Sequence, residues 1–452
     1  MNGTDVKPET VQKAAGSRLP STFRALRHRN FQLFFAGQFI SLTGTWMQTV
    51  AQSWLIYRLT GSVVLLGMIG FAAQFPVFVL TPFGGAVADR YNRHRILLFT
   101  QSAAMCLAFV LAFLTLTGRI EIWHLFVIAS GFGIANAFDI PTRQAFAVDM
   151  VGKEDMINAI ALNSSMFNGA RIVGPAIAGI VVAAVGEGWC FFGNAVSYIG
   201  VLSGLMMMKI TPVVRPRTAG TFKNIAEGFG YVIRTKPVIA LLLLLGVVSL
   251  MGMPYAVLMP IFADQILGGG SSTLGFLMGA SGIGALSAAL VLASRKHVFG
   301  LGRWVVLACG GFGIALILFS LSRNFWLSAL LLVPVGFAMM TQMSSSNTLI
   351  QAMIPDELRG RVMSVYSMMF MGLAPLGSLL AGTLAGMIGA PETVALGGAV
   401  CITAAVIFRY MAAPLQEEGR RMIVSMQMTG GEPASKAIAQ IPSDAQPAKE
   451  RN

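Results

Sequence analysis

The sequence predicts an all-α membrane protein in which twelve transmembrane helices form two pseudo-symmetric six-helix bundles. The first observation behind this fold class is composition: of 452 residues, 55% are hydrophobic and only 11% are charged. Soluble proteins carry roughly a quarter charged residues, so most of this surface faces something other than water. The second is a series of apolar runs that one polar stretch divides six and six. The third is a set of sequence matches between the two halves.

The apolar runs are long enough to cross a bilayer, since a spanning helix needs about 20 apolar residues. They cover residues 32–57, 63–88, 96–117, 122–144, 157–185, 189–208, 238–266, 273–293, 302–321, 325–350, 362–388 and 391–411. The expected organisation is an N-terminal tail, a first bundle, a linker, a second bundle and a C-terminal tail, at residues 1–30, 31–208, 209–237, 238–411 and 412–452.

Basic residues set the expected orientation of the spans. Loops on one side contain only Arg58, Arg119 and Arg323, whereas loops on the other side contain fifteen Lys and Arg residues. Because cytoplasmic loops are enriched in Lys and Arg, both termini are expected to be cytoplasmic. The same bias accounts for the net charge of +13, so nucleic acid is not an expected partner. We expect a monomer in the lipid bilayer.

Polar segments lie between and after the bundles. The linker contains apolar residues at helical spacing, which predicts an amphipathic helix on the cytoplasmic membrane face. These residues are Phe222, Ile225, Phe229, Val232 and Ile233. The tail from residue 412 is polar and rich in Ala, Pro, Gln and Glu, which predicts disorder.

The two halves match each other in the same direction. At an offset of 208 residues, Gly44 matches Gly252, and Leu66-Gly67 matches Leu274-Gly275. At an offset of 203 residues, Ser164, Phe167, Gly169, Gly174 and Gly179 match Ser367, Phe370, Gly372, Gly377 and Gly382. A parallel six-plus-six repeat predicts a central cavity between the bundles. Chance identity among Gly, Ser and Leu is the alternative.

Residues 85–95 form the most specific motif, Gly-Ala-Val-Ala-Asp-Arg-Tyr-Asn-Arg-His-Arg. A carboxylate at a helix end can accept hydrogen bonds from a nearby Arg. The motif resembles the major facilitator superfamily signature, Gly-x-x-x-Asp-Arg-x-Gly-Arg-Arg/Lys, with departures at Asn92 and His94. The resemblance implies a latch for the outward-facing state, made of Gly85, Asp89, Arg90 and Arg93 and completed by Asp139 in span 4. The alternative is a basic loop that only fixes topology.

Span 5 contains a second motif, at Gly174, Pro175 and Gly179. It resembles the exporter motif of the superfamily, Gly-x-x-x-Gly-Pro-x-x-Gly-Gly, with Ala178 in place of the penultimate Gly. The resemblance favours efflux over uptake. Small residues and a proline also suit close helix packing in any membrane protein, which is the alternative.

Arg171 lies about 15 residues into span 5, roughly 20 Å from the cytoplasmic surface. A charge at that depth is costly unless it faces a cavity or a partner. Two interpretations are open. Arg171 contacts an anionic or carbonyl-rich substrate, or it caps backbone carbonyls that Pro175 frees.

A polar stripe runs along span 1. It consists of Gln38, Ser41, Thr45, Gln48 and Gln52, at steps of three and four residues. Because such a face is costly in lipid, the stripe either lines the cavity or bonds to neighbouring helices. Substrate contacts are expected from Gln38, Thr45, Gln48, Gln52, Asn136, Asn163 and Arg171.

Residues 23–31, 52–62 and 138–145 resemble the superfamily branch that contains the enterobactin exporter and the transmembrane secretion effectors. The resemblance covers residues 22–411. It implies a proton-driven exporter in a bacterial inner membrane, with a siderophore or a drug-like amphiphile as substrate. Membrane-embedded carboxylates are scarce, since Asp139 and Asp264 lie near span ends, so proton coupling rests on the resemblance. Uptake by the same fold and a non-transporting sensor or scaffold are the rival functions.

The sequence indicates no catalytic chemistry. It lacks the phosphate-binding pattern Gly-x-x-x-x-Gly-Lys-Ser/Thr, and no nucleophile–base motif occurs. Its four histidines are scattered without metal-ligand spacing, and its four cysteines lie in apolar segments. We expect neither an enzyme nor a metal site nor a cofactor, with a proton gradient as the driving force.

Overall fold

The computed structural model describes residues 21–152, 155–208, 221–294 and 300–428, and no β-strand occurs among them. Most of the predicted N-terminal tail, residues 209–220 of the predicted linker and the tail beyond residue 428 lie outside the described residues.

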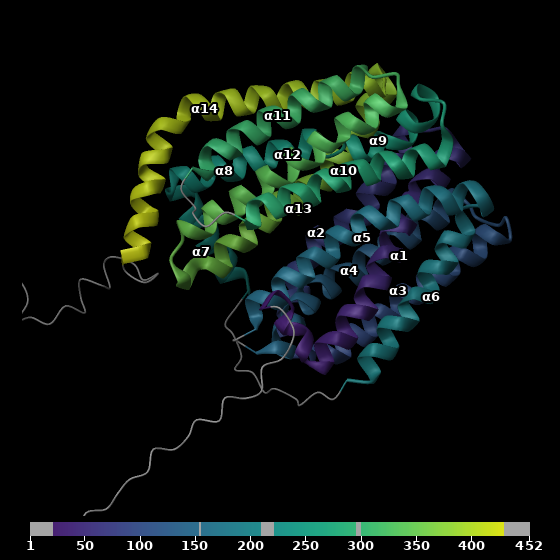
Figure 1. Ribbon diagram of the computed structural model, residues 1–452, viewed down its shortest axis with the longest axis horizontal. Helices are drawn as coiled ribbons and strands as arrows, with labels where there is room; N and C mark the ends of the chain where they lie inside the picture. The colour runs from purple at the N-terminus through teal and green to yellow at the C-terminus, as the bar shows by residue number, and fades with distance from the viewer. Residues whose placement is uncertain (1–20, 153–154, 209–220, 295–299, 429–452) are drawn as a thin grey trace, which may run out of the picture.

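The N-terminal bundle consists of the first six long helices (Figure 1). They are α1 (Arg29–Thr60), α2 (Val63–Arg90), α3 (Arg93–Leu116), α4 (Ile122–Val151), α5 (Met156–Val185) and α6 (Glu187–Met206), preceded by the 3-10 helix η1 (Ser21–Arg27). Polar side chains cap the first turns of α2 and α3, each of which follows a short connection. The Ser62 hydroxyl accepts from the Leu65 N–H at the start of α2, and the Asn92 side chain accepts from the His94 N–H at the start of α3.

The C-terminal bundle follows α7 (Thr221–Arg234). Its first span is composite, built from α8 (Lys236–Val247), η2 (Val248–Gly252), α9 (Tyr255–Ile261) and η3 (Phe262–Ile266). The remaining helices are α10 (Gly270–Ala293), α11 (Leu301–Leu321), α12 (Phe325–Ala352), α13 (Asp356–Ile388) and α14 (Ala390–Met428). Both η2 and η3 are π-helical turns, which frequently occur at functional positions.

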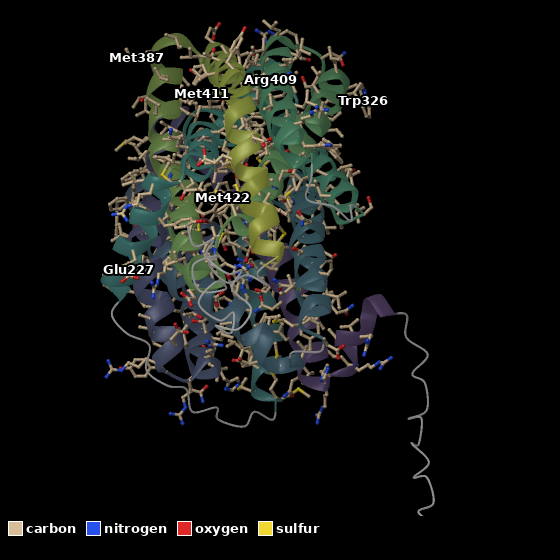
Figure 2. The ribbon with its side chains drawn as sticks, turned by 90° about the vertical axis from the view of Figure 1, so that its left-hand side faces the viewer. Glu227, Trp326, Met387, Arg409, Met411 and Met422 are labelled. Atoms are coloured by element: carbon tan, nitrogen blue, oxygen red, sulfur yellow. The ribbon has the colours of Figure 1, made fainter. Side chains whose placement is uncertain are left out.

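The surface of the molecule is that of a membrane protein. Eleven helical segments in the described part of the chain are long and apolar enough to span a membrane. Helix α1 is not among them because polar residues interrupt it, but its 32 residues run beside α5 and α6. Large apolar side chains such as Phe99, Leu307, Trp326 and Met387 are exposed, and Figure 2 shows the last two at the periphery. Because such a surface suits lipid, the predicted fold class is confirmed.

Glycines join the two bundles at one end. The terminal side is the side on which η1, α7 and the end of α14 lie, and the far side is the opposite one. In the far-side halves of the helices, Gly179 of α5 packs on Gly275 of α10, and Gly67 of α2 packs on Gly382 of α13. The Tyr57 hydroxyl also donates to the Asp264 carboxylate across the bundles, at 2.8 Å. The bundles meet at the right of Figure 1 and diverge toward the lower left.

The glycines in these contacts are positions that the predicted repeat matches between the two halves. Gly179 and Gly382 are equivalent at the offset of 203 residues, and Gly67 and Gly275 are equivalent at 208. The contact of α5 with α10 and that of α2 with α13 are therefore the same contact, repeated by a pseudo-two-fold axis.

Helix α7 packs against the C-terminal bundle, in addition to having the predicted amphipathic pattern. Glu227 pairs with Arg361 of α13, and the backbone at Gly228 lies against that of Arg361. The Tyr231 hydroxyl donates to the Met353 carbonyl. Burial raises the pKa of Tyr231, so this hydroxyl stays protonated and available as a donor. The C-terminal part of the predicted linker is therefore a helix fixed to α13.

The chain remains helical beyond the point where the sequence predicted disorder. Residues 412–428 continue α14, whereas a disordered tail was expected from residue 412. The extension has a surface to pack on: Ile423 is buried, and Gly419 lies close to Met353 and Pro237. Figure 2 shows Met422 of this extension and Glu227 of α7 on one face of the C-terminal bundle.

Candidate functional site

The predicted latch residues lie where α2, α3 and α4 meet on the terminal side. Arg93 contacts Asp89 at 3.2 Å and also donates to the Ala88 carbonyl at 3.1 Å. Its second carboxylate partner is Asp149 of α4, at 3.0 Å. The Arg93 side chain is only 12% exposed, whereas that of Asp89 is 57% exposed. Arg93 therefore joins three helices, and Asp89 is left open to a further contact.

Two latch residues differ from the expectation. The structure does not bring Asp139 to Arg93, because α4 runs to Val151 and places Asp149 at the level of the α2–α3 turn. A Cβ added to Gly85 meets no other atom, so no helix approaches it closely in this conformation. Arg90 lies exposed beside the Tyr91 ring. The latch itself stays a prediction.

Asp139 belongs to a separate polar network inside the N-terminal bundle. Its Oδ1 accepts from the Thr100 hydroxyl at 2.9 Å and from Gln101 Nε2 at 2.7 Å, both on α3. Its Oδ2 lies 3.4 Å from Nε of Arg143, one turn along α4. Arg143 in turn donates to Gln38 of α1 at 3.2 Å. A buried carboxylate thus links α4 directly to α3 and, through Arg143, to α1.

The polar stripe of α1 faces its own bundle for part of its length. Gln38 and Gln48 are buried, and each bonds within the bundle, to Arg143 and to Asn194 of α6 respectively. Interhelical hydrogen bonding, the alternative to cavity lining, therefore describes these two residues. Thr45 donates to the Ser41 carbonyl, and Gln52 is half-buried.

Arg171 lies at the interface between the bundles. Its guanidinium carbon is 5.8 Å from the centre of the Trp46 ring of α1, a cation–π distance. Its backbone carbonyl lies against Gly282 of α10, and Tyr255 of α9 is near enough to interact electrostatically. Among the described residues it has no ion-pair or hydrogen-bond partner. Capping of carbonyls near Pro175 is therefore not what holds it.

The two predicted asparagine contacts have different exposures. Asn136 of α4 is exposed, whereas Asn163 of α5 is half-buried. Exposed Ile134 is two residues from Asn136, or about 200° around the helix. The two exposed side chains therefore lie on nearly opposite sides of α4.

The exporter-like motif forms close contacts on both sides of α5. A Cβ at Gly174 would lie 2.5 Å from Trp46 Cβ of α1, and one at Gly179 would lie 3.1 Å from Gly275 Cα of α10. The Pro175 carbonyl also lies against Gly275. Close packing is thus what the motif does here, and this packing includes the contact between the bundles.

Several residues of these sites were not identified in the sequence. They are Trp46, Thr100, Gln101, Arg143, Asp149 and Tyr255. Asp149 was detectable in principle, because extending span 4 by one turn and a half places it beside the basic α2–α3 turn. The others depend on which helices are neighbours. No cluster of three or more metal-ligating side chains occurs among the described residues.

Comparison with known proteins places these features in a family. The sequence profile of a family described as transmembrane secretion effector matches residues 20–436. The staphyloferrin A transporter of Staphylococcus aureus is 29% identical over 383 residues, covering 83% of this chain and 95% of that protein. The enterobactin exporter EntS of Escherichia coli is 24% identical over 361 residues, covering 80% and 86%.

Solved structures share the fold at low sequence identity. The nucleoside transporter NupG superposes with a TM-score of 0.67 at 14% identity, covering 86% of this chain and 99% of its own. A POT family transporter superposes with a TM-score of 0.70 at 12% identity, covering 86% and 96%. These similarities support the arrangement of helices and nothing finer.

Proposed function

The chain belongs to the transmembrane secretion effector family of the major facilitator superfamily, and we propose that it exports a small amphiphilic compound in exchange for protons. The two relatives are named for siderophores, and a siderophore or a drug-like compound is the proposed substrate. The positive-inside bias of the loops makes the terminal side cytoplasmic in a bacterial inner membrane. The described conformation then faces inward, with its far side closed.

The observation that carries the proposal is the guanidinium of Arg171. A cation in a membrane interior is costly unless it faces a partner or a water-filled space. In the described part of the chain Arg171 has only the Trp46 ring and the nearby Tyr255. An anionic or carbonyl-rich group of a substrate supplies the missing partner, and the aromatic rings suit its apolar part.

Alternating access follows from the position of this site. Arg171 lies where α5 meets α10, so separating the bundles on the far side exposes it there, while closing the terminal side covers it from the cytoplasm. Gly85 and Asp89 are one turn apart on an uncovered face of α2. We assign them to the latch that holds the terminal side closed in the outward-facing state, with Arg93 and Asp149 fixing its base.

Transport into inside-out membrane vesicles tests direction and coupling. Labelled staphyloferrin A is the first probe and enterobactin the second, and profiling of a deletion strain supplies the retained compound if neither is carried. Accumulation driven by an imposed pH gradient supports export. Accumulation in right-side-out vesicles instead indicates uptake, and saturable binding without flux indicates a sensor.

Replacing Arg171 tests the substrate contact. Arg171→Gln removes a charge-assisted interaction of about 1.5–3 kcal/mol, so transport is expected to fall about tenfold or more, with Arg171→Lys less affected. Arg409→Gln is the matched control, because Arg409 is exposed on α14 (Figure 2). Equal transport by Arg171→Gln and the control variant would remove Arg171 from the substrate site.

A further inference from the structure

We propose that Asp139 is the group that binds and releases the transported proton. This inference rests on the proposed proton-coupled export and names the residue responsible. It assigns Asp139 a role different from the latch, since the contacts of Asp139 are all with the buried network of α1, α3 and α4.

The charged form of Asp139 is held by three contacts. Thr100 and Gln101 both donate to Oδ1, and Arg143 approaches Oδ2 through a single nitrogen. The side chains of Asp139 and Arg143 are 7% and 18% exposed. Ionisable side chains in transmembrane segments are rare and often serve in proton relays. The single long contact with Arg143 leaves Oδ2 able to take a proton.

The same network has unused groups for the protonated form. A carboxylic acid carries an O–H that needs an acceptor, and Gln101 Oε1 is buried without a hydrogen-bond partner. Turning the Gln101 amide replaces its donor Nε2 by this acceptor. Gln38 Nε2 is likewise buried without a partner, so the Gln38 amide can also turn when Arg143 moves. An ion pair with only a structural role would need neither the unpaired Gln101 Oε1 nor the unpaired Gln38 Nε2.

Polar side chains connect Asp139 with the surface of α4. Exposed Asn136 and partly exposed Arg143 flank it at one turn on either side, which gives water a polar route to the carboxylate. In the described part of the chain, the charged and titratable groups facing Asp139 are Arg143 of α4 and Tyr198 of α6. Helices α1 and α3 contribute the neutral groups of Gln38, Thr100 and Gln101.

The only covalent change in the proton step is the making and breaking of the Asp139 O–H bond. In the outward-facing state water delivers a proton to Oδ2, the O–H bond forms and the contact with Arg143 is released. Rotation of the carboxyl group about its Cβ–Cγ bond then brings this O–H to the side of Gln101, whose turned amide accepts it. In the inward-facing state the proton returns to water, and the carboxylate pairs again with Arg143. The described conformation has the paired arrangement expected after release.

Infrared spectroscopy of the full chain in nanodiscs tests the assignment without any substrate. Spectra recorded across a pH titration are expected to show the carbonyl band of a buried carboxylic acid. That band is expected to disappear in Asp139→Asn and to remain in Glu187→Gln, the matched control, because Glu187 is also buried and pairs with Arg58 at 2.7 Å. Persistence of the band in Asp139→Asn overturns the assignment.

A second variant covers the case in which Asp139→Asn does not fold. Gln101→Leu keeps the carboxyl group but removes the amide that bonds to it, so the frequency of the carbonyl band is expected to change. A carbonyl band at an unchanged frequency overturns the assignment.

Vesicle transport separates this inference from the proposed function. Asp139→Asn is expected to lose gradient-driven accumulation about tenfold or more while keeping exchange of labelled for unlabelled probe. Full gradient-driven accumulation by a folded Asp139→Asn contradicts the assignment. Exchange without gradient-driven accumulation in the unsubstituted protein instead contradicts proton-coupled export and leaves the infrared result to stand by itself.

Discussion

Replacing Gly275 with Ala tests whether the far-side glycines hold the bundles in the described conformation. The added Cβ would lie 2.5 Å from the carbonyl oxygen of Pro175 and 2.7 Å from the Cα of Gly179. Both are backbone atoms of α5, which cannot rotate away as a side chain would, so α5 and α10 must separate. Overpacking of this kind costs about 1–3 kcal/mol.

This cost applies only while α5 and α10 are in contact. It therefore changes the ratio of the two conformations by roughly 5- to 150-fold toward the one with its far side open. Distances between spin labels at Leu59 and Gln265 measure the change, because both positions are exposed and flank the Tyr57–Asp264 contact. The labels require a background in which exposed Cys106 is replaced, since the other three cysteines are buried.

The control is Gly311→Ala in α11, where an added Cβ meets no atom. A longer distance is expected to become populated in Gly275→Ala and not in this control. Identical distance distributions for the two variants would refute the reasoning that backbone contact at glycine sets the closed far side.

Further substitutions probe the two ends of the molecule. Arg93→Gln removes hydrogen bonds to two carbonyls and two carboxylates and is expected to destabilise the protein by about 2–3 kcal/mol, seen as a lower Tm in detergent. Asp149→Asn is expected to lower Tm more than Asp89→Asn, because Asp89 is more exposed; the reverse order contradicts the assignment of Asp149. Tyr57→Phe removes the hydroxyl that donates to Asp264, so the far side is expected to open about fivefold more often, measured by the distance between spin labels at Leu59 and Gln265. A distance distribution equal to that of Thr383→Val, whose hydroxyl bonds only within its own helix, would show that this contact does not restrain opening.

The sequence was sufficient to predict the fold because composition and periodicity decide it. A lipid-facing helix must be apolar over its whole length, so each span is visible as a run of residues. The repeat was also visible, because close helix contacts require glycine and the same glycines recur in both halves. Gly179 and Gly382 were predicted as equivalent positions, and the structure places them in equivalent contacts.

The candidate site was only partly predictable, because one sequence does not say which helices are neighbours. The periodicity of Gln38 and Gln48 correctly places them on one face of α1, but a polar face suits a cavity and a polar neighbour equally well. Asn194 and Arg143 settle the question, and both lie more than 100 residues away. Asp139 shows the same limit: its spacing from Arg143 is visible, whereas its contact with Gln101 depends on the packing of α3.

The distribution of polar contacts explains how the bundles can separate while each stays intact. Inside the N-terminal bundle, buried Asp139 pairs with partly buried Arg143, so pulling those helices apart leaves uncompensated charge in the membrane. Between the bundles, the far-side contacts consist mainly of glycine backbone, with two hydrogen bonds, from Tyr57 to Asp264 and from Ser272 to the Gly179 carbonyl. Asp264 is exposed, so water replaces its partner when the far side opens. The molecule is thus weakest along the surface between its halves, and motion about that surface exposes Arg171 to either side while the helices of the N-terminal bundle stay packed together.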